Sequence, residues 1–183
     1  MRIQTFYYFI ALMSSLFLFN PALAYEGFNV CNYGKQTVDD VICFKPTVLK
    51  GTIVKGDIKV TGTLRAENVS TRNLLIDGDA DISDIFVGGA ANIKGNLTAN
   101  TVEFKNGVAI VGDDITLNNS KVNGMVTITS KDNQPYLRVT CGSVVTGAVL
   151  FDGKAGVIQI TRDALVQGKV INGAMEFIKK DCK

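Results

Sequence analysis

The chain has 183 residues, and it contains no histidine, no tryptophan and only three prolines. Histidine is the usual general base of nucleophilic catalysis, so its absence excludes a Ser-His-Asp triad and a Cys-His pair. The glycine-containing segment 87–95 has neither the lysine nor the helix start of a phosphate-binding loop. We therefore expect no enzymatic activity, no catalytic residue and no cofactor.

Long runs of one charge are also missing. The formal net charge is +2, and the only basic cluster is the short one of Lys179, Lys180 and Lys183. A nearly neutral chain attracts nucleic acid or anionic lipid weakly, so we expect no nucleic-acid partner. No apolar run after residue 24 is long enough to cross a bilayer, so no integral membrane span is expected after that point.

One apolar run does lie at the start of the chain. Arg2 is followed by an apolar stretch from Phe6 to Phe19 and then by an Ala-Leu-Ala pattern that ends at Ala24. This order is typical of a secretory signal peptide covering residues 1–24, and the stretch is short for the roughly 30 Å of a bilayer core. The sequence thus predicts an exported protein, periplasmic or at the cell surface, that begins at Tyr25.

All four cysteines follow this predicted cleavage site: Cys31, Cys43, Cys141 and Cys182. An even number of cysteines behind an export signal indicates disulfides, and four cysteines allow three pairings. The local spacing favours Cys31–Cys43, which leaves Cys141–Cys182. A structural metal site is the alternative, but the chain has no CxxC pair and no histidine to support it.

A short pattern built around glycine recurs along the chain. Apolar residues stand two positions before and two positions after the glycine, as in Val122-Asn-Gly124-Met-Val126, while the intervening positions are mostly polar. Such alternation indicates half-buried strands. Glycine weakens a strand interior, so we expect these glycines at sharp corners, where a side chain would crowd the core and a positive φ is needed. The set is Gly51, Gly56, Gly62, Gly78, Gly95, Gly112, Gly124, Gly147, Gly168 and Gly173, of which Gly112 keeps only the preceding apolar residue.

The spacing of this pattern defines a repeat. Gly62, Gly78, Gly95 and Gly112 are 16, 17 and 17 residues apart. A unit of about 17 residues is shorter than a tetratricopeptide, an ankyrin repeat or a propeller blade, and it matches one turn of a parallel β-helix. The expected fold class is therefore all-β, a single-stranded parallel β-helix (solenoid). The alternative is a β-sandwich with glycines at bulges, but sandwich strands rarely repeat one pattern at a fixed interval.

The repeat also divides the chain beyond the signal peptide. It covers residues 48–173, whereas residues 25–47 lack it and are expected to form a short N-terminal cap with a short helix within 34–44. The open ends of a solenoid expose core and unpaired strand edges, so caps are needed. Residues 174–183 are expected to be a C-terminal tail or cap, and residues 130–136 are expected to be an inserted loop.

The segments VKGDIKVTGTL (54–64), LLIDGDADI (74–82) and IKGNLTA (93–99) resemble the bactofilin, or polymer-forming cytoskeletal, β-helix domain. The resemblance implies a right-handed helix of short coils that joins end to end into filaments without nucleotide. The export signal and the cysteines near both ends depart from that pattern, because disulfide-stapled ends would block end-to-end joining. Hexapeptide acyltransferases and β-helical carbonic anhydrases are excluded, because both need histidine.

Four carboxylates lie close together in the sequence: Asp77, Asp79, Asp81 and Asp84. Stacked coils could bring some of them onto one outer face, where they would be candidate calcium ligands or an acid/base pair acting on a glycan. The simpler interpretation is a solvated face, because aspartate is common at turns. A glycan-binding face also usually offers stacking aromatics, and the four aromatics of the repeat (Phe86, Phe104, Tyr136 and Phe151) are scattered, with Phe151 on the inward row.

The sequence therefore predicts a non-catalytic, exported structural, adhesive or scaffold protein in the form of a rigid rod. Its expected partners are a second copy of itself, or a protein or glycan of the cell envelope or surface. The alternative function is a calcium-dependent or glycan-binding β-helix protein, less favourably a glycan-cleaving one, that uses the face of Asp77–Asp84.

Overall fold

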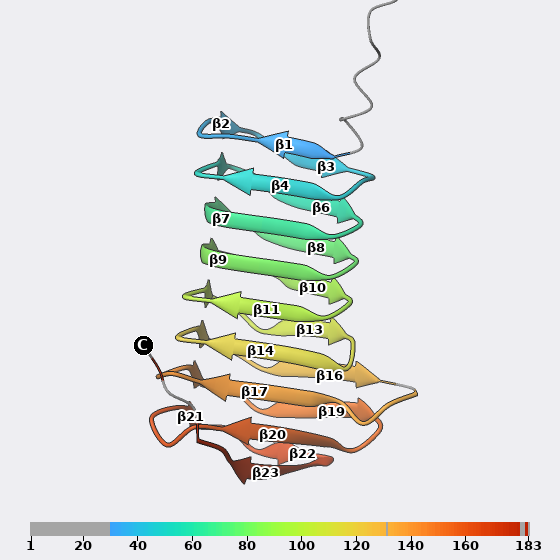
Figure 1. The fold of residues 1–183 in the computed structure, drawn as a ribbon, viewed down its shortest axis with the longest axis vertical. Coiled ribbons are helices and arrows are strands. Elements are labelled where there is room, and N and C mark those ends of the chain that lie inside the picture. Colours follow the sequence, from blue (N-terminus) through green and yellow to red (C-terminus); the bar gives the residue numbers. More distant parts are fainter. Residues whose placement is uncertain (1–29, 131, 180–181, 183) are drawn as a thin grey trace, which may run out of the picture.

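Apolar and polar residues alternate along short strands, so one side of each strand faces a common interior. The computed structural model describes residues 30–130, 132–179 and 182, and the predicted signal peptide lies outside these residues. The described chain winds into a stack of about nine parallel coils (Figure 1). Each complete coil follows three faces, which we number in chain order.

The first face has one strand segment in every coil. It is formed by β1 (Cys31–Tyr33), β4 (Thr47–Lys50), the first half of β7 (Leu64–Thr71), the first half of β9 (Ala80–Val87), β11 (Leu97–Asn100), β14 (Asp114–Asn118), β17 (Tyr136–Thr140), β20 (Gly156–Ile160) and β23 (Gly173–Phe177).

The second face is narrow. It is formed by β2 (Thr37–Val38), β5 (Ile53–Val54), the second halves of β7 and β9, β12 (Glu103–Phe104), β15 (Lys121–Val122), β18 (Val144–Val145) and β21 (Leu165–Val166). It belongs to the same 15-stranded sheet as the first face.

The third face is a separate 8-stranded sheet. Its strands are β3 (Val41–Cys43), β6 (Asp57–Thr61), β8 (Asn73–Asp77), β10 (Ala91–Lys94), β13 (Val108–Val111), β16 (Val126–Ser130), β19 (Val149–Gly153) and β22 (Val170–Ile171).

Every pairing between coils is parallel and in register. Leu64 pairs with Ala80, and Ala80 pairs with Leu97, so Leu64 and Leu97 occupy the same inward position two coils apart. Both leucines are buried, as is Phe151, which the sequence placed on the inward row. The largest fully buried side chains, Phe104 and Phe151, fill the interior at the second and third faces. The predicted parallel β-helix is thus confirmed.

Most of the predicted corner glycines line up in two columns. Gly62, Gly78, Gly95 and Gly112 stack at the corner between the third and first faces, which we call the third corner. Gly56, Gly124, Gly147 and Gly168 lie at the second corner, between the second and third faces, together with the unpredicted Gly107. Gly51 lies at the first corner. Gly173 lies inside β23 instead, where an added Cβ would meet the ring of Phe151.

Gly51, Gly62 and Gly78 have the positive φ that the sequence predicted, but at the other corner glycines the reason differs from the one the sequence suggested. At Gly95, an added Cβ would overlap the carbonyl of Gly78 in the preceding coil, and at Gly147 it would overlap the backbone of Gly124. The crowding therefore acts along the stack, between coils, rather than into the core. Neither glycine has a positive φ, so close approach of two backbones is sufficient to require glycine there.

The same contact explains why the first coil was missed. β1 pairs with β4 and β3 pairs with β6, so residues 31–43 already form a coil instead of a cap with a helix within 34–44. No coil precedes it among the described residues, so its corners have no backbone to avoid. In this first coil, Asp39 and Asp40 face Gly56 of the next coil, and Lys45 and Pro46 face Gly62, so non-glycine residues occupy these corners.

The C-terminal boundary is also shifted. Residues 174–177 belong to β23, which pairs with β20 and forms part of the last coil instead of a tail or cap. Met175 and Phe177 occupy inward positions in register with Ile158 and Ile160, but they are 43% and 74% exposed. Among the described residues no strand pairs with the far edge of β23, so this end of the core is open.

Both disulfides have the predicted pairing. Cys31 is bonded to Cys43 within the first coil, over a sequence separation of 12 residues. Cys141 is bonded to Cys182, over a separation of 41 residues, and this bond ties the chain after β23 back to the corner that follows β17. Residues 132–135, within the predicted inserted loop, contain no strand.

Candidate functional site

The four clustered aspartates do not meet at one site. Asp77 ends β8 on the third face and pairs with Lys94 at 3.7 Å, while Asp79 lies at the third corner and accepts a hydrogen bond from the backbone N–H of Asn96 at 2.7 Å. Asp81 lies on the first face, beside Arg65 in register. Among the described residues, no group of three or more acidic, cysteine or histidine side chains is placed to hold a metal ion.

Asp84 has a different role, at the first corner. It adopts a left-handed backbone conformation with φ of 52°. The equivalent positions of neighbouring coils do the same: Gly51, Asn68, Thr101, Asn119 and Cys141 have φ between 48° and 63°. In these six successive coils the first corner is therefore closed by one left-handed residue, and asparagine and aspartate tolerate this conformation better than most residues. These residues are of five types, so apart from the predicted corner glycine Gly51 the sequence pattern did not reveal them as turn residues.

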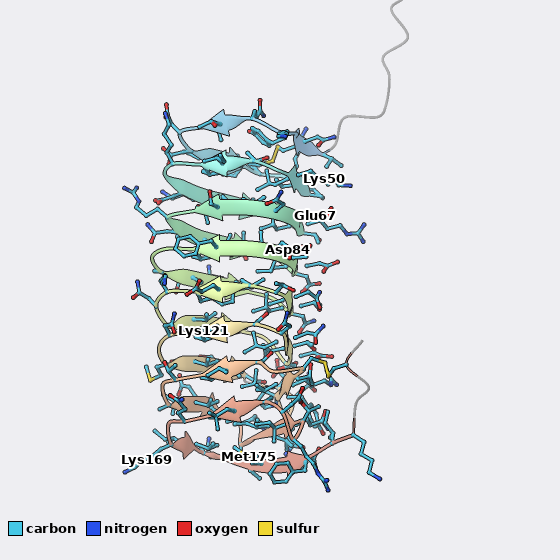
Figure 2. All side chains as sticks on the ribbon, turned by 90° about the vertical axis from the view of Figure 1, so that its left-hand side faces the viewer. Lys50, Glu67, Asp84, Lys121, Lys169 and Met175 are labelled. Atoms are coloured by element: carbon cyan, nitrogen blue, oxygen red, sulfur yellow. A yellow bond between two sulfur atoms is a disulfide. The ribbon has the colours of Figure 1, made fainter. Side chains whose placement is uncertain are left out.

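A trough runs along the first corner and the adjoining second face. One wall consists of the left-handed residues Gly51, Asn68, Asp84, Thr101 and Asn119. The other wall consists of the outward residues two positions later, Ile53, Ser70, Phe86, Glu103 and Lys121, and Lys35 lies at one end. The trough has a volume of about 740 Å³ and crosses five coils. Figure 2 looks onto this side, with Asp84 and Lys121 labelled.

Two apolar side chains of this trough are unusually exposed. Ile53 is 54% exposed and Phe86 is 40% exposed. The ring of Phe86 has Lys105 at 5.8 Å from its centroid, a cation–π contact that holds the ring while it still lines the trough. In the register of the second face, Ile53 and Phe86 lie two coils apart, with Ser70 between them.

The charges of the trough balance. Lys35 and Lys121 lie towards its two ends, and Asp84 and Glu103 lie between them. The carboxylate of Glu103 lies 3.0 Å from the ammonium of Lys105. The hydrogen bond from Lys105 is the main cause that lowers the pKa of Glu103, and a hydrogen bond from Asn123 lowers it further. Glu103 is therefore an ionised hydrogen-bond acceptor at neutral pH. The trough offers both donors and acceptors with no net formal charge.

A second hollow lies on the third face. It has a volume of about 320 Å³ and is lined by Ile42 of β3, Phe44 just after β3 and Leu75 of β8, with Lys59 and Lys94 beside them. Phe44 is 79% exposed. The outward side of the first face, by comparison, is mostly polar. Examples are Thr98 and Asn100 on β11 and Thr116 and Asn118 on β14.

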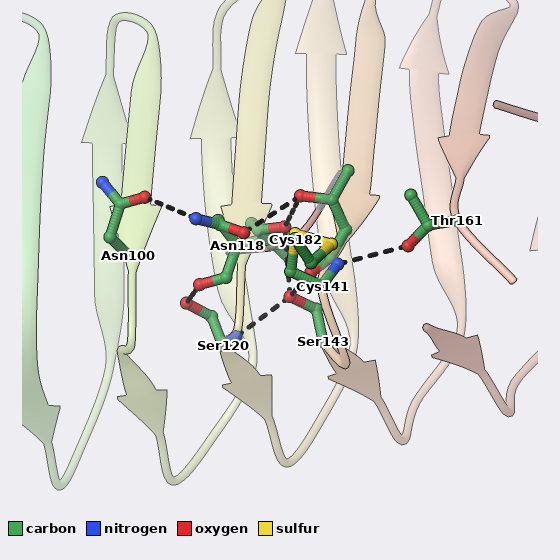
Figure 3. Close-up of a disulfide and its surroundings, with 9 residues drawn as sticks. Asn100, Asn118, Ser120, Cys141, Ser143, Thr161 and Cys182 are labelled. Atoms are coloured by element: carbon green, nitrogen blue, oxygen red, sulfur yellow. Dashed lines mark hydrogen bonds between the residues drawn. A yellow bond between two sulfur atoms is a disulfide. The ribbon is translucent and has the colours of Figure 1, made fainter. Parts of the chain in front are cut away.

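Polar side chains on the outside and in the interior of the stack bridge successive coils by hydrogen bonds. Asn118 donates to the side-chain oxygen of Asn100 at 3.0 Å, and the backbone N–H of Ser120 donates to the hydroxyl of Ser143 at 2.9 Å (Figure 3). The backbone N–H of Cys141 donates to Thr161 at 3.2 Å. In the described part of the chain, no buried side-chain nitrogen or oxygen lacks a hydrogen-bond partner. The buried polar side chains of the described residues therefore offer no vacant group for chemistry.

The sequence predicted Asp84 as a candidate metal ligand and did not single out the trough. Its residues come from five coils and form no local motif, so only the register of the coils brings them together. The coil interval is the signal that could have found them, because positions 53, 70, 86 and 103 recur at intervals of 17, 16 and 17 residues.

Comparisons with known proteins add no family. The chain matches no protein-family model, no curated protein and no solved structure. The parallel β-helix is therefore established by the structure alone. The described residues include no helix with the length and apolarity needed to cross a membrane.

Proposed function

We propose that the protein is an exported, non-catalytic scaffold that acts as a rigid β-helical rod in the periplasm or at the cell surface. The observation that carries this proposal is the unbroken parallel pairing of successive coils from β1 to β23. Each coil is held by backbone hydrogen bonds to its neighbours and by one continuous core, so the stack has no hinge between coils. The two disulfides are compatible with an oxidising, extracytoplasmic location.

The absence of histidine from the whole chain supports the non-catalytic part of this proposal. The finer assignment to a bactofilin-like family rests on the glycine pattern and the coil length. Filaments formed end to end would require both ends of the stack to be accessible, and the exposed Met175 and Phe177 offer an apolar surface at one of them. We propose that the rod is the functional unit and that any self-association uses this C-terminal end.

Light scattering and electron microscopy of oxidised protein lacking residues 1–24, across a concentration series, test the proposal. About nine coils at a spacing of ~4.8 Å give a stack roughly 43 Å long. We expect stiff particles of this length. If particles of multiple length form instead, the variant Phe177→Glu should reduce them to the length of a single rod. Compact or flexible particles would contradict the rod, and side-by-side bundles insensitive to Phe177→Glu would contradict the assignment of the C-terminal end.

A further inference from the structure

We propose that the trough along the first corner binds a linear, β-1,4-linked glycan in an extended conformation, without cleaving it. This inference rests on the proposed scaffold function and deepens it, because it names the class of polymer that the rod would hold.

The first argument is the spacing. Neighbouring coils are separated by about 4.8 Å, and each coil adds one residue to each wall of the trough. One hexose of an extended β-1,4-linked chain advances by a similar length. A glycan lying along the trough would therefore present one sugar to each coil, and the same pair of wall positions would meet each sugar.

Apolar and polar side chains alternate along part of one wall. Its outward residues in register are Ile53, Ser70, Phe86, Glu103 and Lys121, and apolar and polar side chains alternate over the first four of them, up to Lys121. In a β-1,4-linked chain each sugar is turned over relative to the last, so its apolar ring face returns at every second sugar. Ile53 and Phe86 would contact the apolar faces of alternate sugars, while Ser70 and Glu103 would meet the hydroxyl groups of the intervening ones.

The opposite wall is polar, and the trough as a whole is nearly neutral. Asn68, Asp84, Thr101 and Asn119 provide side-chain donors and acceptors at successive coils, which suits a ligand with hydroxyl or acetamido groups on every unit. Two lysines and two carboxylates give the trough no net formal charge. A polyanion such as nucleic acid would meet Asp84 and Glu103 unfavourably, so a neutral polymer fits better.

Calorimetric titration with three hexasaccharides tests the proposal. The extended β-1,4-linked probes are cellohexaose and chitohexaose, and the control is maltohexaose, whose α-1,4 linkages give a coiled chain of the same size. We expect at least one β-1,4-linked probe to bind and maltohexaose not to bind. Phe86→Ala should weaken this binding about tenfold, because an aromatic contact to a sugar ring is lost.

Phe44→Ala is the matched control, because it removes an exposed phenylalanine from the third face instead of the trough. It should leave the affinity unchanged, and circular dichroism should show that both variants keep the β fold. Binding that Phe86→Ala leaves intact, equal binding of maltohexaose, or no binding of either β-1,4-linked probe would overturn the proposal.

The failure of this inference can be distinguished from failure of the scaffold function. Chromatography of each probe after incubation with the protein should recover it uncleaved. Binding followed by cleavage would refute the non-catalytic scaffold but keep the glycan site. A stiff rod that binds no β-1,4-linked probe would keep the scaffold and refute the glycan site.

Discussion

The second and third corners of the coil differ from the first in how they turn the chain. At the second and third corners, glycine is needed because the backbone of the preceding coil lies where a Cβ would be. At the first corner, residues of several types adopt a left-handed conformation, and a side chain is tolerated. Space between coils thus limits the second and third corners, with a positive φ added at Gly62 and Gly78, whereas backbone conformation alone limits the first. The comparison teaches that a regular repeat need not use one residue type at equivalent turns.

The largest expected effect separates these two limits. Gly95→Ala should destabilise the protein by about 1–3 kcal/mol, because its Cβ would force the backbone of Gly78 to move. The left-handed conformation plays no part at Gly95, so this value measures the close approach alone. The midpoint of urea unfolding, compared with the unsubstituted chain, gives the measurement.

Two other glycines provide matched controls for this variant. Gly142 has a φ of 74° and no atom within 4 Å of an added Cβ, so Gly142→Ala should cost only the conformational strain of about 1–2 kcal/mol. Gly34 has neither constraint, and Gly34→Ala should change the free energy of unfolding by less than about 0.5 kcal/mol. If Gly95→Ala were as mild as Gly34→Ala, the close-approach explanation would be wrong.

A smaller effect, of opposite sign, is expected at the first corner. Thr101 is β-branched and has a φ of 56°, which is unfavourable for such a residue. Thr101→Gly should relieve about 1–2 kcal/mol of strain and lose about 0.5–1 kcal/mol through backbone entropy, so a net gain of between zero and about 1.5 kcal/mol is expected. Urea unfolding again measures this change.

Thr98 is the control for that substitution, because it lies three residues earlier, on β11 in ordinary strand conformation. Thr98→Gly should destabilise the protein by about 0.5–1 kcal/mol. A destabilisation of equal size at Thr101 would show that the left-handed conformation carries no strain.

The smallest effect concerns the third corner that contains the inserted loop. Asp113 accepts hydrogen bonds from Asn133 at 2.7 Å and from Ser130 at 2.5 Å, and these lower the pKa of its carboxyl. A lowered folded-state pKa means that the stabilisation is present above the pKa of the unfolded carboxyl, about 3.9, and is lost as pH falls through the folded-state value. We expect the melting temperature of the unsubstituted chain to fall in this acidic range more steeply than that of Asp113→Asn.

Asp132→Asn removes a charge from the same loop without touching these hydrogen bonds, so it should keep the steep acid dependence. If the melting temperatures of the unsubstituted chain and of Asp113→Asn fell in parallel with pH, Asp113 would not stabilise this corner.

The predictability of the fold follows from these different corners. The third-corner glycines stand at a nearly constant interval, so the coil length and the parallel stacking could be predicted. The pairing of Leu64 and Leu97 with Ala80 shows the same register that their shared sequence context suggested. The first coil was not recognised, because corners without a preceding coil do not need glycine, and Lys45 and Pro46 can occupy such a position.

The candidate site was less predictable than the fold. Asp77, Asp79, Asp81 and Asp84 are close in sequence, but the chain turns through the third corner and the first face between them, so they point to different surroundings. The trough has the opposite property. Ile53 and Phe86 are far apart in sequence and become neighbours two coils apart only when the register is known.

The disulfide between Cys141 and Cys182 has a mechanical consequence. When the two chain ends are pulled apart, a stack of coils gives way one coil at a time, starting from a terminus, because each coil is held only by its neighbours. The disulfide joins two residues that are 41 positions apart and so closes a covalent loop. Tension arriving from the C-terminus passes through this bond to Cys141 and bypasses the coils inside the loop. The last coils are thereby protected from peeling at the C-terminus, whereas the N-terminal end can still peel, and there the bond between Cys31 and Cys43 shortens the first length of chain that can be released.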